Sequence, residues 1–167
     1  GNRLRMGKKR TVFYPLRPGI GEHMFDRSKS ILLVEDNHDH AELVYRSLEE
    51  NEITTPMKRV ADGEEALEYL QKQGEYSEST HLDPDLILLD LRLPKMDGLE
   101  VLRWLKNSEE FQNIPIVILS SSDADDDRCA SYKLRANAYV VKPIDFLELM
   151  ELTRSLDSFW LNWNTSA

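Results

Sequence analysis

The chain has 167 residues, of which 41% are apolar and 31% are charged. This composition can build a folded core, so it excludes wholesale disorder, and the length fits one domain with an arm or tail. No apolar run approaches about 18 residues, so we expect neither a membrane span nor a signal peptide. The single cysteine, Cys129, excludes an internal disulfide and a zinc site with several cysteines, and it favours a reduced, cytoplasmic location.

The net charge of -9 is distributed unevenly along the chain. Residues 1–30 contain eight basic and two acidic residues, whereas the remainder contains 13 basic and 28 acidic residues. An acidic body is a poor ligand for a phosphate backbone. We therefore expect residues 1–29 to be a flexible basic extension, and binding of nucleic acid through this arm is the alternative.

From about residue 30, short apolar runs alternate five times with segments of helical periodicity. We expect strands at residues 31–34, 56–60, 86–89, 116–119 and 139–141. Helices are expected after each strand, the second opened by Asp62 and Gly63, the fourth capped by Asp123, and the last running over residues 146–156. The segment from Gly74 to Asp83 is expected to be a polar loop.

Five strand-then-helix units predict an α/β fold of the (βα)5 type, with a five-stranded parallel sheet that is doubly wound. Each parallel connection needs a crossover, so helices should cover both faces of the sheet. Ligands of such sheets bind at the carboxyl ends of the strands. The chemistry should therefore lie directly after each apolar run.

The residues at these positions are three acids, a hydroxyl and an amine: Glu35, Asp36, Asp90, Ser120 and Lys142. Three carboxylates close together repel, and a divalent cation would offset that repulsion. Because only oxygen ligands are available, the pattern indicates Mg²⁺ rather than zinc. Asp90 would then be a carboxylate nucleophile toward phosphorus, with Lys142 and Ser120 binding oxygens of the transferred group.

Four segments together resemble the receiver domain of bacterial two-component response regulators, over about residues 30–157. The segments are Ile31–Asn37, Asp85–Gly98, Ile114–Ser120 and Tyr139–Pro143. Each one alone is weak, because an acid after a strand is as often a helix cap or an ordinary strand exit. Their order and their positions at strand ends make the set specific, and the resemblance implies the flavodoxin-like receiver fold.

The resemblance implies a phosphoacceptor and a metal site. Asp90 would accept a phosphoryl group from a phosphohistidine of a sensor histidine kinase. Asp36 would bind Mg²⁺ directly and Glu35 mostly through water, and the backbone carbonyl of Arg92 would complete the protein ligands.

The resemblance also implies residues that bind the phosphoryl group and change conformation. Ser120 and Lys142 would hold the phosphoryl group, and Ser120 would move toward it while Tyr139 turns inward. The peptide bond between Lys142 and Pro143 would be cis.

One subgroup of this family is a closer match, the stand-alone regulators paired with bacterial and cyanobacterial phytochromes. The closer resemblance lies in the first helix, Gly74–Tyr76 and Phe159–Leu161. The tail over residues 158–167 carries Phe159, Trp160 and Trp163, which would either fold back on the last helix or bury against a second copy. We favour a homodimer, as this subgroup implies.

The function predicted from these features is a response regulator that is switched by phosphorylation and signals through protein contacts, or passes the phosphoryl group along a phosphorelay. No residues are left for a DNA-binding output domain, and the only catalysis expected is the protein's own phosphorylation and dephosphorylation. A haloacid-dehalogenase-type phosphatase is the enzymatic alternative, but it needs a second aspartate where Arg92 stands. A dinucleotide-binding domain would need a glycine-rich turn where Glu35 to His38 stand.

Two histidines, His38 and His40, lie beside the acids and resemble a transition-metal cluster. Residues two apart point to different helix faces, so the two imidazoles would not chelate one ion. We expect both to be solvent-exposed.

Overall fold

The computed structural model describes residues 29–142, 145–158 and 160. Its five strands are β1 (Ile31–Val34), β2 (Met57–Val60), β3 (Leu86–Leu89), β4 (Ile116–Ser120) and β5 (Ala138–Val141). Its helices are α1 (His38–Glu50), α2 (Gly63–Gln71), the short 3₁₀ helix η1 (Gly74–Tyr76), α3 (Gly98–Asn107), α4 (Asp125–Lys133) and α5 (Phe146–Leu156). All strand pairs are parallel, in the order β2-β1-β3-β4-β5, so the predicted doubly wound sheet is confirmed.

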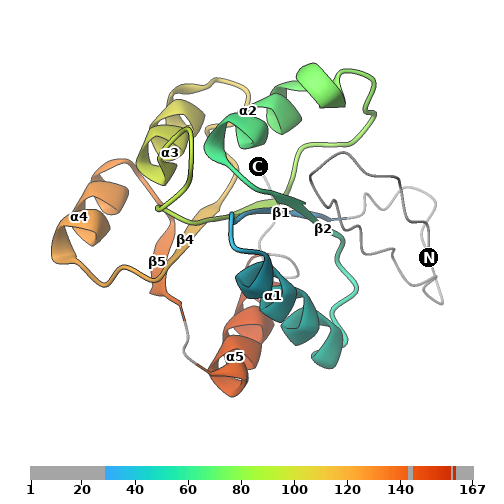
Figure 1. The fold of residues 1–167 in the computed structure, drawn as a ribbon, viewed down its shortest axis with the longest axis vertical. Coiled ribbons are helices and arrows are strands. Elements are labelled where there is room, and N and C mark those ends of the chain that lie inside the picture. The colour runs from blue at the N-terminus through green and yellow to red at the C-terminus, as the bar shows by residue number, and fades with distance from the viewer. Residues whose placement is uncertain (1–28, 143–144, 159, 161–167) are drawn as a thin grey trace.

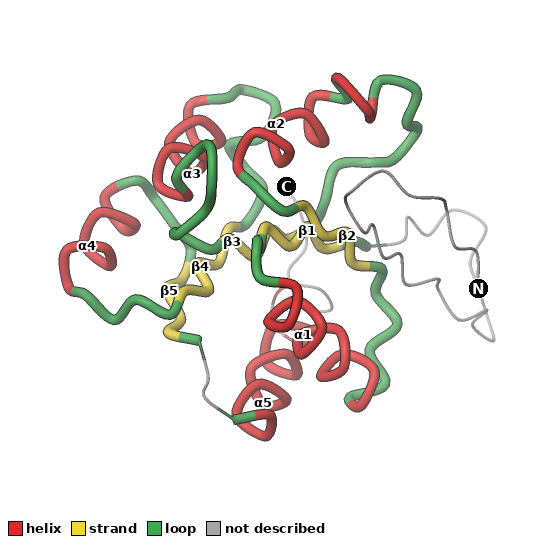
Figure 2. Tube along the Cα trace, in the orientation of Figure 1, coloured by secondary structure: helices red, strands yellow, loops and turns green. Residues whose placement is uncertain are grey.

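Helices α1 and α5 cover one face of the sheet, and α2, α3 and α4 lie on the other side (Figures 1 and 2). The apolar strands supply both cores, because successive side chains of a strand point to opposite faces. In β1, Leu32 and Val34 belong to the core beneath α2 and α3, whereas Ile31 and Leu33 belong to the core beneath α1 and α5. Burial on both faces explains why the strands read as continuous apolar runs.

Four helices begin at a residue whose side chain accepts a backbone hydrogen bond, as N-caps do. These residues are Asn37, Asp62, Asp97 and Asp145. The fourth helix differs from the prediction, since its N-cap is Ala124 and no side chain caps it. Asp123 lies one residue too early to cap α4, so that prediction was wrong.

The segment predicted as a polar loop after α2 folds back on that helix. The Tyr76 hydroxyl donates to Oε1 of Glu65 at 2.7 Å, and the His81 ring stacks on Tyr69 with 3.9 Å between centroids. Only the short η1 helix within it is regular. In the sequence, Tyr76 and His81 stand among polar and charged residues, so the pattern did not indicate that they pack on α2.

Trp160 is half-buried and packs against the core beneath α1 and α5. This contact agrees with a tail that folds back, and the homodimer stays a prediction. Phe159 and Trp163, and Pro143 with the predicted cis peptide, lie outside the described residues. Among the helices that are described, none has the length and apolar character needed to cross a bilayer.

Replacing Gly98 by alanine is expected to destabilise the fold at the base of the site. The new Cβ would collide with the carbonyl oxygen of Asp90 and would lie 2.6 Å from Cα of Leu91, both backbone atoms that cannot rotate away. We expect the free energy of unfolding to fall by about 1–3 kcal/mol, as for other overpacked sites. Urea unfolding measures the loss, with the exposed Glu100→Ala in the same helix as a control that should change it by less than about 0.5 kcal/mol. Equal stabilities for the two variants would contradict this packing.

Candidate functional site

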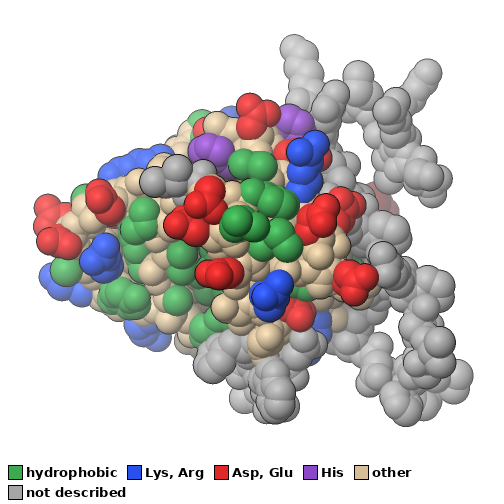
Figure 3. All heavy atoms as spheres, turned by 90° about the horizontal axis from the view of Figure 1, so that it is seen from below, with side chains coloured by type: hydrophobic (Ala, Val, Ile, Leu, Met, Phe, Trp, Pro, Cys, Tyr) green, Lys and Arg blue, Asp and Glu red, His purple; other side chains and the backbone are tan. Residues whose placement is uncertain are grey.

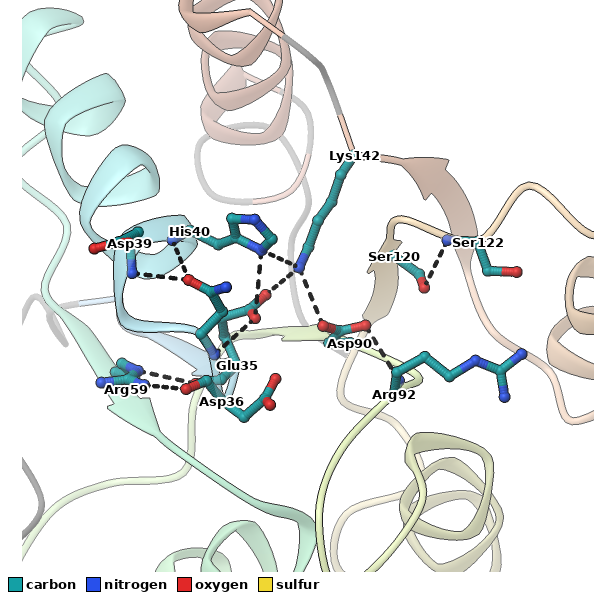
Figure 4. A network of polar contacts seen from close by, with 11 residues as sticks. Glu35, Asp36, Asp39, His40, Arg59, Asp90, Arg92, Ser120, Ser122 and Lys142 are labelled. Atoms are coloured by element: carbon teal, nitrogen blue, oxygen red, sulfur yellow. Dashed lines mark hydrogen bonds and ion pairs between the residues drawn. The ribbon is translucent and has the colours of Figure 1, made fainter.

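Three acidic side chains meet at the carboxyl edge of the sheet. Val34 of β1 pairs with Leu89 of β3, so the residues that follow, Glu35 and Asp90, leave the sheet side by side. The Asp90 amide donates to the Val34 carbonyl at 3.1 Å, which continues the parallel pairing. One carboxylate oxygen from each of Glu35, Asp36 and Asp90 lies within 4.8 Å of the other two. The predicted convergence of the acids is therefore present (Figure 4).

Lys142 follows the edge strand β5, and its side chain reaches two of these acids. Its backbone amide donates to the Ser120 carbonyl at 2.7 Å, which aligns the ends of β4 and β5. Its ammonium Nζ donates to Oε2 of Glu35 at 2.5 Å and to Oδ2 of Asp90 at 3.1 Å. All three side chains are largely buried, so one cation is shared by two carboxylates in a place where water screens them little.

His40 is solvent-exposed, as the sequence predicted, and it also takes part in the site. Its Nδ1 lies 3.1 Å from Nζ of Lys142 and 3.8 Å from Oε1 of Glu35. An ammonium has three N–H groups, and Nδ1 accepts the third one when the imidazole proton is on Nε2. The side chain is still 46% exposed, so His40 forms the rim of the site. Its position in the first turn of α1, directly after the acids, was the signal in the sequence.

Arg59 at the end of β2 was also missed. Its Nε donates to the Glu35 carbonyl and its guanidinium NH2 group donates to the Asp36 carbonyl, both at 2.9 Å. This fork fixes the backbone that carries two of the three acids. The available signal was an arginine next to Lys58 within a short predicted strand, because a charge that becomes buried needs partners.

Ser120 ends β4, Arg92 follows β3, and Tyr139 lies within β5. The Ser120 side chain is fully buried, and its Oγ accepts from the amide of Ser122 at 3.3 Å. The Arg92 amide donates to Oδ1 of Asp90 at 3.2 Å. The Tyr139 hydroxyl donates to the Ser122 carbonyl at 2.7 Å, which ties β5 to the loop after β4.

A cavity of about 290 Å³ opens beside the charged cluster, between α1 and α5. Glu35, His40 and Lys142 form its polar wall. The remaining lining is mostly apolar: Leu43, Val44, Leu119, Ser121 and Leu149. Figure 3 views the molecule from the side of α1 and α5, and there apolar side chains gather between acidic and basic ones. The cavity therefore has one charged wall and a mostly apolar remainder.

The oxygen donors fit a hard divalent cation. Glu35, Asp36 and Asp90 supply carboxylate oxygens close enough to share one ion, with no sulfur or imidazole among them. Lys142 contributes the positive charge that two of these acids need. A divalent ion bound by the acids would take over part of that role.

Burial keeps Glu35 protonated to a higher pH than is usual for a glutamate. It raises the pKa of Glu35 to about 7, and the hydrogen bond and charge of Lys142 offset only part of this effect. The folded protein therefore holds a proton on Glu35 over a pH range in which the unfolded chain has released it.

The chelator-treated protein is expected to lose stability as the pH rises from about 4.5 to about 7. Over that window the folded state binds more protons at Glu35 than the unfolded state does, so the free energy of unfolding falls, by an amount on the order of 2–3 kcal/mol. Urea unfolding at several pH values in EDTA measures it. Glu35→Gln should flatten this dependence, while the exposed Glu49→Gln should keep it; equal slopes in both variants would contradict the assignment.

The sequence profile of the response regulator receiver domain matches residues 31–154. FilR2 of Methanothrix harundinacea, a probable methanogenesis regulatory protein, is 42% identical over 136 residues, which cover 81% of this chain and 86% of FilR2. The response regulator Rcp1 of a Synechocystis species is 42% identical over 133 residues, which cover 80% of this chain and 89% of Rcp1.

Two solved structures carry the same similarity into three dimensions. The phosphorylated cyanobacterial phytochrome response regulator RcpA aligns with a TM-score of 0.76 at 40% identity, over 83% of this chain and 98% of RcpA. The Mn²⁺-bound form of Rcp1 aligns with a TM-score of 0.75 at 41% identity, over 83% of this chain and 99% of that one. The chain belongs to the response regulator receiver-domain family and is related to the phytochrome response regulators of cyanobacteria.

Proposed function

We propose that this protein is a phosphoacceptor response regulator, in which Asp90 takes a phosphoryl group from a sensor histidine kinase in a Mg²⁺-dependent reaction in the cytoplasm. The observation that carries the proposal is the position of Asp90. Its carboxylate lies 3.1 Å from the Lys142 ammonium, and one of its oxygens is within 4.8 Å of oxygens of Glu35 and Asp36. A nucleophile flanked by a cation and by ligands for a second cation suits the transfer of a group rich in negative charge.

In the proposed reaction, one carboxylate oxygen of Asp90 attacks phosphorus, and the bond from phosphorus to the kinase histidine nitrogen breaks. Glu35, Asp36, Asp90 and the Arg92 carbonyl would hold Mg²⁺, which would supply positive charge to the phosphoryl oxygens. Nζ of Lys142 is 3.1 Å from Asp90, within reach of an oxygen of the transferred group.

Ser120 and Tyr139 are proposed to respond to the transferred group. The buried Ser120 hydroxyl, whose oxygen accepts from the Ser122 amide in this structure, donates its own proton to a phosphoryl oxygen. Tyr139 then turns inward and leaves the Ser122 carbonyl that it contacts in this structure. The surface near β5 changes with it, which is how phosphorylation would reach a partner.

We further propose that the kinase partner is a phytochrome. The support is the similarity to RcpA, whose structure is that of a phytochrome response regulator. The proposed output is a protein contact or a phosphorelay step. A homodimer through the aromatic tail stays a prediction.

Incubation with phosphoramidate and Mg²⁺ should add one phosphoryl group to the wild type, detected by intact mass. Asp90→Asn should gain none, because the amide is not a nucleophile toward phosphorus. The exposed Asp123→Asn makes the same change elsewhere and should behave as the wild type. An adduct on Asp90→Asn, or none on the wild type, would overturn the proposed function.

Lys142→Met is expected to move two measurements in opposite directions. Removing the ammonium should slow phosphoryl uptake by about 100-fold, as loss of one group that stabilises developing charge does. It should also tighten Mg²⁺ binding, measured by calorimetry, because Glu35 and Asp90 lose the cation they share. The exposed Lys133→Met should change neither. Weaker Mg²⁺ binding in Lys142→Met would show that the lysine does not compete with the metal.

A further inference from the structure

Helix α4 is held to the domain in a different way from the other helices. Of its nine residues, all of them described, Ser131 alone is buried, and no side chain caps its N-terminus. By contrast, α3 buries Val101, Leu102 and Leu105 completely. A helix with so little buried apolar surface depends on polar contacts to stay in place.

Those polar contacts converge on Asp127 in the first turn of α4. Its Oδ2 accepts from the guanidinium of Arg92 at 2.6 Å and from Oγ of Ser122 at 2.6 Å. The Asp127 side chain is only 13% exposed. Asp127 therefore links α4 to the loop after β3 and to the loop after β4, and Ser122 in turn is the acceptor for Tyr139.

Arg92 connects this cluster to the phosphoacceptor. Its backbone amide donates to Oδ1 of Asp90, yet its side chain extends away from Asp90 on the side of Ser122 (Figure 4). The Arg92 side chain is 60% exposed, so few packed neighbours oppose its movement. Arg92 thus lies two positions after Asp90 in the chain, and its guanidinium is bound by the Asp127 carboxylate on α4.

We propose that the Arg92–Asp127 ion pair is a latch that holds α4 in the unphosphorylated protein and that a phosphoryl group on Asp90 opens. This inference rests on the proposed function. A phosphoryl group brings about -1.5 to -2 charges and three acceptor oxygens, so it competes with the single charge of Asp127 for the guanidinium fork. Once Arg92 turns toward the phosphoryl group, Asp127 keeps Ser122 alone, and the N-terminal turn of α4 loosens.

The latch adds a route from Asp90 to α4 that does not pass through Ser120. It runs along the loop after β3, through Arg92 to Asp127. It also meets the loop after β4, because Ser122 and Arg92 share one acceptor oxygen. The loop after β3 and the loop after β4 therefore both contact α4 through Asp127. Ser122, in the second of these loops, is also the residue whose carbonyl Tyr139 contacts.

Hydrogen exchange of the α4 amides tests the latch, with and without phosphoramidate and Mg²⁺. In the unmodified protein, Arg92→Ala should speed exchange of α4 about two- to fivefold, the effect of one exposed ion pair. Asp127→Ala should speed it at least as much, and the double variant should add nothing to Asp127→Ala. In the phosphorylated wild type, α4 should exchange faster by a similar factor, and Arg92→Ala should add nothing further.

Asp126→Ala is the matched control, because it removes the same charge from the first turn of the exposed face of α4. In this variant, Arg92→Ala should still speed exchange of the α4 amides in the unmodified protein. It should still add nothing in the phosphorylated protein. Equal acceleration by Arg92→Ala in both states, or none in the unmodified protein, would overturn the latch. Intact mass of the same samples separates the two ideas: an adduct without faster α4 exchange sinks the latch alone, whereas the absence of any adduct sinks the proposed function and the latch together.

Discussion

One ammonium group shared by two buried carboxylates organises this protein. Glu35 and Asp90 leave neighbouring strands at the same edge of the sheet, and their charges would repel if nothing lay between them. Nζ of Lys142 lies within hydrogen-bonding distance of both. The cluster stays short of charge balance, since a third acid, Asp36, adds its oxygen to the group. A site that is folded and still rich in negative charge is prepared to take a further cation.

The two sides of the site are supported in different ways. At the ends of β1, β2 and β3, the Arg59 fork and the close packing of Gly98 against the backbone of Asp90 hold the acids in place. On the side of β5, α4 has little buried surface and depends on Asp127 and its partners. Chemistry needs fixed groups, and a switch needs an element that moves at small cost in free energy. The distribution of packing meets both needs within one small domain.

The similarity to RcpA and Rcp1 gives this arrangement a context. One of these structures is of a phosphorylated protein and the other holds Mn²⁺, and both share the fold over more than four fifths of this chain. In this chain, further side chains contact the site. His40 completes the contacts of the Lys142 ammonium, and Arg92 reaches α4 through Asp127. Such contacts around a common site are where relatives of one family can differ in rate and in output.

The sequence alone determined the order of strands and helices, because continuous apolar runs and helical periodicity depend on local spacing. It also determined that acids, a hydroxyl and an amine follow the strands, and the carboxyl-end rule for parallel sheets placed them together. It did not reveal the parts of His40 and Arg59 in the site, or the missing cap at Ala124. These features depend on how segments far apart in the chain are placed relative to one another. The packing of α1 and α4 on the sheet, and the position of β2 within it, decided them.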